Sequence, residues 1–131
     1  MKSSGTLVDT SVWIDFFRGA PSIKNSLEKL IARDEIFTAG PVPYELLQGV
    51  RLPEEKKQVK EALLSTNYLE IISNDWEEAA LLSSTLRAQG ITLPTTNILI
   101  GHLAKARNLE VISFDPHFDQ IPGIRHHKLT P

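Results

Sequence analysis

Short apolar runs alternate along this chain with longer segments in which apolar residues recur every three or four positions. Short runs predict buried strands, and helical spacing predicts amphipathic helices. Strands are predicted at residues 6–9, 35–38, 68–72 and 109–114, with a short edge strand at 125–129. Helices are predicted at residues 11–17, 22–33, 44–50, 54–65, 76–88 and 98–107. Because strands and helices alternate, we expect an α/β fold with a central, mainly parallel sheet flanked by helices.

The composition is that of a globular protein with a substantial core. The chain has 131 residues, of which 41% are hydrophobic and 23% charged, and we expect one domain over residues 1–131. It has no cysteine, which excludes disulfides and thiolate metal sites. No apolar stretch approaches the roughly 20 residues of a membrane span, and the first residues lack the apolar segment of a signal peptide. We therefore expect a cytoplasmic protein with no membrane partner.

The net charge of −2 argues against a protein that coats nucleic acid through bulk positive charge. It does not exclude a nuclease, because an enzyme that uses metal ions needs acids at its site. Lys56, Lys57 and Lys60 form a basic cluster on one predicted helix. We interpret this cluster as a solvated face, with RNA contact as the alternative.

Four polar residues occupy the ends of predicted strands or the starts of predicted helices. Asp9 and Asp115 each follow an apolar strand. Glu45 lies in the first turn of a predicted helix, and Asn97 just precedes another. Since the carboxyl ends of parallel strands meet at one edge of a sheet, we expect these four side chains to converge there.

Three of these four residues are acids, and clustered carboxylates repel one another unless a cation holds them together. The candidate ligands all carry oxygen, so Mg²⁺ or Mn²⁺ fits best, and such a site suits phosphodiester hydrolysis. Capping is the alternative, because acids are also common at helix starts. In that interpretation Thr10 or Ser11 caps the first helix, and Asn97 caps the helix that comes after it.

Three stretches of the chain resemble PIN-domain proteins, and in particular the toxin component of VapBC toxin–antitoxin pairs. Residues 7–19 (LVDTSVWIDFFRG) and 93–101 (LPTTNILIG) carry the first part of the resemblance. Residues 111–118 (VISFDPHF) are similar to the last motif of the family, with an acid after the strand and an aromatic residue three positions later. The resemblance extends over nearly the whole chain, and the ordered set is more specific than any single motif.

The resemblance implies a PIN-like three-layer fold and a Mg²⁺- or Mn²⁺-dependent endoribonuclease that acts on tRNA or ribosomal RNA loops, often as a homodimer. It also implies a small VapB-like antitoxin that wraps the toxin and blocks its site. The first, second and fourth acids of the family fall on Asp9, Glu45 and Asp115, and the third falls on Asn97. The expected metal ligands are Asp9, Asn97 and Asp115. A hydroxyl beside the first acid commonly assists, and this hydroxyl is Thr10 or Ser11 here.

One position departs from the family pattern, because the third acid falls on Asn97. This amide can offer a carbonyl oxygen to a metal, but it brings no negative charge and cannot act as a base. We therefore expect weaker metal binding and attenuated RNA cleavage. Three explanations remain open: an Asp→Asn change introduced to allow expression of a toxic nuclease, which we favour, a natural inactive or altered member, and a site that works with three acids.

Two other functions compete with this hypothesis. Asn97 favours a non-catalytic PIN domain that binds an antitoxin or RNA without cutting it. Asp9 could instead accept a phosphoryl group, but that chemistry usually needs a second acid two residues later, where Ser11 stands. Trp13 and Trp76 are expected in the core or in an interface rather than as platforms for substrate stacking.

Overall fold

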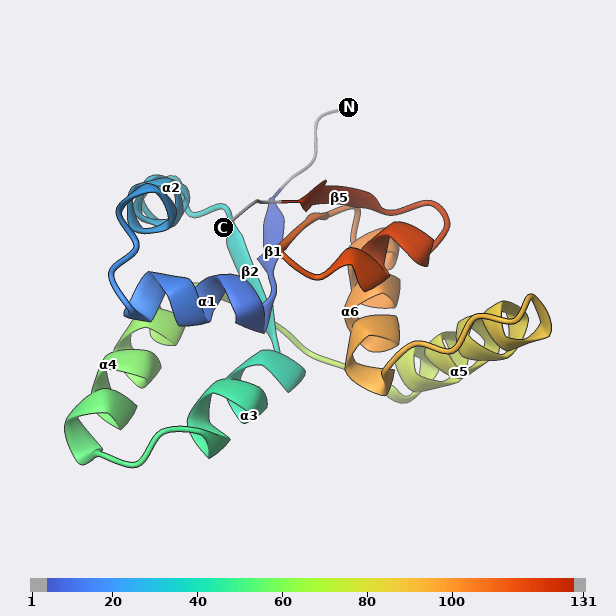
Figure 1. Ribbon diagram of the computed structural model, residues 1–131, viewed down its shortest axis with the longest axis horizontal. Helices are drawn as coiled ribbons and strands as arrows, with labels where there is room; N and C mark the ends of the chain where they lie inside the picture. The colour runs from blue at the N-terminus through green and yellow to red at the C-terminus, as the bar shows by residue number, and fades with distance from the viewer. Residues whose placement is uncertain (1–4, 129–131) are drawn as a thin grey trace.

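Figure 1 shows the computed structural model, which describes residues 5–128. Within this range the chain forms one sheet of five strands, all parallel, in the order β3-β2-β1-β4-β5. The strands are β1 (Thr6–Val8), β2 (Ile36–Ala39), β3 (Asn67–Leu69), β4 (Glu110–Ser113) and β5 (Arg125–Lys128). The predicted α/β fold with a central parallel sheet is confirmed.

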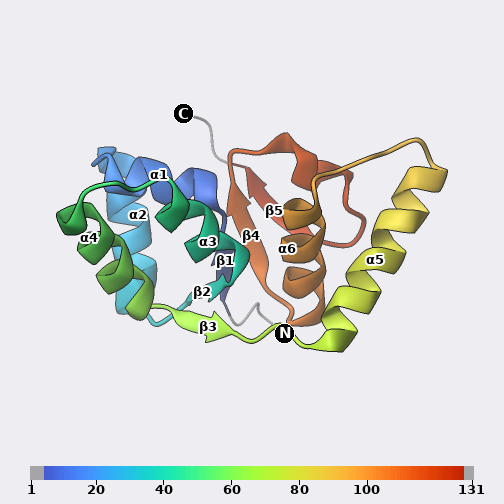
Figure 2. The same cartoon turned by 90° about the horizontal axis from the view of Figure 1, so that it is seen from below.

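Helices cover both faces of this sheet, which gives the three layers expected of the fold. Figure 2 shows the first four helices on one side of the strands and the last two on the other. The helices are α1 (Thr10–Phe17), α2 (Pro21–Ala32), α3 (Pro41–Gln48), α4 (Pro53–Leu64), α5 (Ser73–Ala88) and α6 (Thr95–Ala106), with a short 3₁₀ helix η1 (Pro116–Gln120) before β5. None of the helices in this part of the chain is long and apolar enough to cross a membrane.

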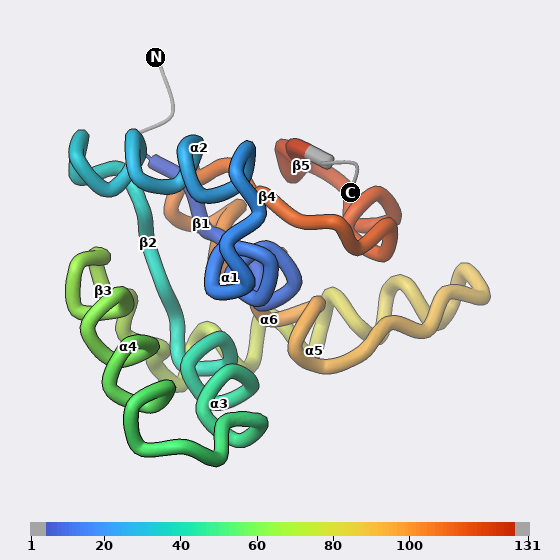
Figure 3. Tube along the Cα trace, turned by 60° about the vertical axis from the view of Figure 1, so that its left-hand side comes forward, coloured from blue at the N-terminus to red at the C-terminus, as the bar shows by residue number. Residues whose placement is uncertain are grey.

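The strand order reverses between β1 and β4. The chain leaves β1 and moves outward through β2 to β3, and then returns through α5 and α6 to β4 on the other side of β1 (Figure 3). Connections that leave two adjacent parallel strands in opposite directions open a crevice at their carboxyl ends, where α/β proteins bind ligands. Val8 pairs with Ile112, and the Asp9 amide donates to the Ile112 carbonyl at 3.0 Å. The fold therefore places the residues after β1 and β4 side by side.

Burial in the core explains why the sequence of β1 ends in consecutive apolar residues, Leu7 and Val8. Leu7 and Val8 are fully buried because helices cover both faces of the sheet. Trp13 is also fully buried, and its ring lies 5.3 Å from Phe16 and 5.8 Å from Phe17 between ring centroids. Trp13 is thus a core residue, as predicted. Trp76 is not in the core, because it lies near the start of α5 and is 52% exposed.

A buried ion pair joins the start of α5 to the end of α6. Asp75 is 3% exposed and accepts two hydrogen bonds from the Arg107 guanidinium, at 2.7 Å to Oδ1 and 2.8 Å to Oδ2. The His102 ring lies 2.9 Å from Oδ1, and the Ile72 amide donates to Oδ2 at 3.0 Å. The bidentate guanidinium holds the pKa of Asp75 well below its usual range, although burial opposes this shift. The negative charge of Asp75 is therefore compensated within the fold by the Arg107 guanidinium.

Element boundaries differ from the sequence prediction mainly at helix starts. Three predicted helices begin about three residues earlier than expected, at Pro41, Ser73 and Thr95. A proline at the first helical position loses no intrahelical hydrogen bond, so the turn before the predicted helix 44–50 is helical. The predicted strand 68–72 ends at Leu69. The edge strand is confirmed as β5, and the last residue predicted for it lies outside the described residues.

Candidate functional site

Asp9 stands at the carboxyl end of β1, where the chain turns into α1. It occupies the N-cap position, but its side chain makes no capping hydrogen bond. Its Oδ2 instead accepts from the Ser113 hydroxyl at 2.7 Å and from the Ser11 hydroxyl at 3.0 Å. Thr10 and Ser11 lie inside the helix, so the prediction that one of them caps it is wrong. Asp9 is 8% exposed, and these hydroxyl partners of its carboxylate are neutral.

Ser113 belongs to the same hydrogen-bonded group and was not predicted from the sequence. It is the last residue of β4 and is fully buried. Its hydroxyl donates to Asp9 and accepts from the Asp115 amide at 2.9 Å, so it connects the two strand-end acids. The Ser11 hydroxyl joins the same network by accepting from the Phe114 amide at 3.3 Å. A hydroxyl two residues before the acid, at the end of an apolar strand, was the available signal.

Asp115 and Asn97 are in direct contact. The Asn97 amide nitrogen donates to Asp115 Oδ2 at 3.0 Å, and the His117 backbone amide donates to Oδ1 at 2.9 Å. The His117 ring nitrogen Nδ1 also lies 2.9 Å from Oδ1. Burial raises the pKa of Asp115, but the hydrogen bonds from His117 and Asn97 outweigh burial, so the pKa is lowered. These contacts keep the Asp115 carboxylate ionised.

Asn97 lies within α6 rather than before it. The helix begins at Thr95 with Pro94 at the N-cap position, so Asn97 is the third helical residue. The prediction that Asn97 caps this helix is therefore wrong. Asn97 is 7% exposed, and its side chain is directed to Asp115 instead of to the helix backbone.

Glu45 joins the site through the first residue of α1. The Thr10 hydroxyl donates to Glu45 Oε1 at 2.8 Å. Because α3 begins at Pro41, Glu45 is its fifth residue and lies past the first turn, so the prediction of a first-turn position is wrong. Thr10 follows Asp9 in the chain, so this hydrogen bond places Glu45 at the same carboxyl edge of the sheet as Asp9.

The predicted convergence therefore takes the form of two hydrogen-bonded groups. One group joins Asp9 to Asp115 and Asn97 through Ser113, and the other joins Glu45 to Thr10. Among residues 5–128, no three histidine, cysteine or acidic side chains lie close enough together to hold a metal ion. The donor chemistry nevertheless suits Mg²⁺ or Mn²⁺, since Mg²⁺ commonly binds through one or two carboxylates and keeps several waters. The oxygen atoms of these residues therefore suit such an ion chemically, although the described residues form no acidic cluster around one point.

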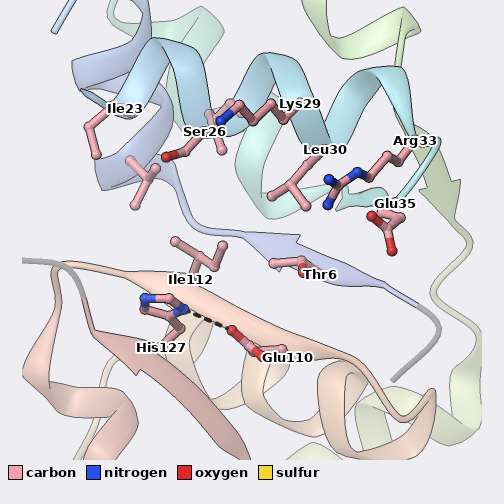
Figure 4. A pocket seen from close by; sticks show the side chains of 12 residues that line it. Thr6, Ile23, Ser26, Lys29, Leu30, Arg33, Glu35, Glu110, Ile112 and His127 are labelled. Carbon is pink, nitrogen blue, oxygen red and sulfur yellow. Dashed lines mark hydrogen bonds and ion pairs between the residues drawn. The ribbon is translucent and has the colours of Figure 1, made fainter. Parts of the chain in front are cut away.

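A separate hollow of about 480 Å³ lies between α2 and strands β1 and β4 (Figure 4). Lys29 and Arg33 line it from α2, Glu35 lies close to Arg33, and Glu110 lines it from β4 (Figure 4). The four candidate site residues, Asp9, Glu45, Asn97 and Asp115, are not among the residues that line this hollow. Its mixed charges do not select an anion, so we place the functional site at the carboxyl edge of the sheet instead.

The fold and the site together define a class of protein: a parallel α/β domain whose acids gather at the carboxyl ends of β1 and β4. The model of the PIN domain family matches residues 6–124, which is most of the chain. The chain belongs to the PIN domain family. Comparison with curated protein sequences gives no significant match.

Solved structures with the same fold include chains of toxin–antitoxin complexes. A chain of VapBC2 from Rickettsia felis, bound to a promoter DNA fragment, superposes with a TM-score of 0.81 at 17% identity, covering 95% of this chain and 98% of that one. A DNA-bound VapBC chain from Salmonella typhimurium gives a TM-score of 0.81 at 20% identity, covering 95% and 97%. A chain of a toxin–antitoxin complex from Klebsiella pneumoniae gives a TM-score of 0.77 at 22% sequence identity, covering 95% of this chain and 100% of that one. At these identities the likeness establishes the fold, which is that of VapC-type PIN domains.

Proposed function

We propose that this chain is a Mg²⁺- or Mn²⁺-dependent endoribonuclease toxin of a VapBC-type pair, with activity attenuated by Asn97. The observation that carries the proposal is the hydrogen-bonded group of Asp9, Ser113, Asp115 and Asn97 at the β1–β4 crevice of a PIN domain. PIN domains are generally nucleases. Asp9 has neutral partners and a nearly buried carboxylate, so its charge is available to a cation.

In this proposal Asp9 and Asp115 hold the ion, and Asn97 offers at most its amide oxygen. When bound, the ion supplies positive charge to the phosphodiester and makes an attacking water more acidic. Ser113 orients the Asp9 carboxylate, and Thr10 orients Glu45 on the same side of the sheet. Asn97 cannot accept a proton at neutral pH, so any base among the four positions is one of the three acids.

A VapB-like antitoxin is the proposed partner, by analogy with the VapBC complexes that share the fold. A hollow of about 350 Å³ between α1, α3 and α4 adjoins Glu45 and carries apolar side chains. These side chains are Ile14, Phe17, Leu46, Val50 and Val59. An amphipathic helix suits such a groove, and an arginine beside it can pair with the site carboxylates.

The remaining parts of the proposal concern assembly, substrate and location. Large apolar side chains of α3 and α5 are exposed, including Tyr44 at 69%, Trp76 at 52% and Leu81 at 62%. A second copy of the chain would cover such side chains, which supports the proposed homodimer. We propose RNA loops of tRNA or ribosomal RNA as the substrate and the cytoplasm as the location, in line with VapC-like toxins.

The test is cleavage of structured RNA by the purified chain with Mn²⁺, followed on a gel. We expect weak cleavage by the parent and at least about 10-fold more by Asn97→Asp, because the change adds charge to the metal site. Asp9→Asn should remove cleavage in either background. Asp34→Asn is the matched control, because Asp34 is exposed and has a left-handed backbone that asparagine also adopts. If Asn97→Asp cleaves no RNA and Asp9→Asn changes nothing, the nuclease proposal is wrong.

A non-catalytic domain that binds an antitoxin or RNA is the second candidate. Asn97 favours it, since the amide already satisfies Asp115 without a metal. Isothermal titration of the parent with Mn²⁺ separates the two functions. Absence of binding at millimolar Mn²⁺, together with retained RNA or antitoxin binding, would favour the non-catalytic domain.

A further inference from the structure

The Asn97 amide is the direct hydrogen-bond partner of the Asp115 carboxylate at the candidate metal site. We infer that the Asn97 amide takes the place of a cation beside Asp115, so that folding of this chain does not depend on metal, and that an acid at position 97 would make it depend on metal. The inference rests on the metal site of the proposed function. It concerns stability rather than catalysis, so it can be measured without substrate.

Each oxygen of the Asp115 carboxylate already has a donor. Oδ2 accepts from the Asn97 amide at 3.0 Å, and Oδ1 accepts from the His117 backbone amide at 2.9 Å. An ionised carboxylate can only accept, so the side chain of Asn97 must present its NH₂ group to it. The amide therefore does for Asp115 what a cation would do, with a partial positive charge instead of a full one.

Burial makes this donor hard to replace with water. Asn97 is 7% exposed and is held in the first turn of α6. Its neighbours along the helix, Ile98 and Leu99, are also buried. Losing a hydrogen bond at such a position leaves a polar group without solvent to replace its partner.

An aspartate at position 97 would place one acceptor against another at hydrogen-bond distance. Two carboxylates that close together repel each other, and a partly buried site screens the repulsion less than bulk water does. A divalent cation between them removes the repulsion by binding both. Metal binding and folding would then be coupled in Asn97→Asp, whereas the parent has no such repulsion to relieve.

The test is the thermal melting temperature, Tm, measured by circular dichroism in EDTA and in saturating Mn²⁺. The parent should melt only slightly higher in Mn²⁺ than in EDTA, because an amide at position 97 leaves its metal site weak. Asn97→Asp should melt about 5–10 °C lower than the parent in EDTA, and Mn²⁺ should recover most of the difference. A larger response to Mn²⁺ in the variant than in the parent is the expected signature.

Two controls separate charge from packing and from the chemical change itself. Asn74→Asp makes the same substitution at an exposed position in the first turn of α5, and should change neither melting temperature by more than about 2 °C. Asn97→Leu removes the donor without adding a charge. It should melt lower than the parent in EDTA and gain no more from Mn²⁺ than the parent does.

A double variant keeps the inference testable even where Asn97→Asp fails to fold. Asn97→Asp with Asp115→Asn exchanges donor and acceptor across the same contact. The amide introduced at position 115 can donate to the new carboxylate while its oxygen still accepts from the His117 backbone amide. We expect the double variant to fold in EDTA with a melting temperature close to that of the parent.

The inference is wrong if Asn97→Asp is as stable as the parent in EDTA, or if the double variant is no more stable than the single one. Its failure is distinct from failure of the proposed function. The melting temperatures decide the inference, and RNA cleavage decides the function. The expected melting pattern without any RNA cleavage would support the inference and contradict the nuclease proposal.

Discussion

The two ends of α6 carry buried carboxylate clusters that are built in opposite ways. At the carboxyl end, Asp75 is 3% exposed and paired with the Arg107 guanidinium through two hydrogen bonds. At the amino end, Asn97 contacts Asp115, and Ser113 connects Asp115 to Asp9, which is 8% exposed. The Asp9 carboxylate accepts from two hydroxyls rather than from a guanidinium.

The difference separates a structural acid from an acid that is open to a ligand. A buried carboxylate with a fixed arginine has its charge compensated within the fold, and it holds α5 against α6. A carboxylate that accepts only from neutral hydroxyls is held in position, but no cation of the protein compensates its charge. A cation can bind the second kind without displacing a protein cation. This contrast is why we assign function to the amino end of α6 and stability to the carboxyl end.

The largest expected effect comes from breaking the structural pair. Arg107→Ala leaves Asp75 buried without its cation, which should cost roughly 3 kcal/mol of unfolding free energy and lower Tm by about 10 °C. Arg107 is partly exposed, so we place the cost at the low end for buried pairs. Urea denaturation measures it, with Arg87→Ala on exposed α5 surface as control. Equal stability of the two variants would contradict the structural role of this pair.

The pH dependence of stability sharpens the comparison. The pKa of Asp75 is lowered in the folded protein, so its contribution is present above the unfolded value of about 4 and is lost as pH falls below it. The parent should therefore exceed Asp75→Asn in unfolding free energy at neutral pH, and the gap should narrow below about pH 4. Denaturant titrations at a series of pH values would show it. A gap that stays constant into acid would mean that the charge of Asp75 is not what stabilises the fold.

The smallest of the three effects concerns the hydrogen bonds that Ser113 makes with Asp9 and with the Asp115 amide. Ser113→Ala removes the donor to Asp9 and the acceptor of the Asp115 amide, which should cost about 1–2 kcal/mol. Ser26→Ala, at an exposed position of α2, is the matched control and should cost less than about 0.5 kcal/mol. Calorimetric melting of both variants compares them. A loss as large as that of Arg107→Ala would remove the distinction between the two clusters.

Sequence patterns predicted much of the candidate site because its residues sit at the ends of regular elements. The apolar runs before Asp9 and Asp115 predict that both acids lie at one edge of the sheet, and the structure brings them together through Ser113. Helix starts were less accurate, because Pro41 and Thr95 extend their helices into segments that read as turns. That shift moves Glu45 out of the first turn and places Asn97 inside α6.

The amino-acid sequence by itself determined the alternation of strands and helices, the buried run of β1 and the residue types at the site. These depend on local patterns, since burial on both sheet faces demands apolar residues and the first residue past a strand end reaches the crevice. Only the tertiary structure decided the partners: Arg107 for Asp75 across 32 residues, Ser113 for Asp9 across 104, and the Asn97 amide for Asp115. A side chain's partner depends on which elements become neighbours. The chain returns from β3 through α5 and α6 to β4, and this path places β4 next to β1.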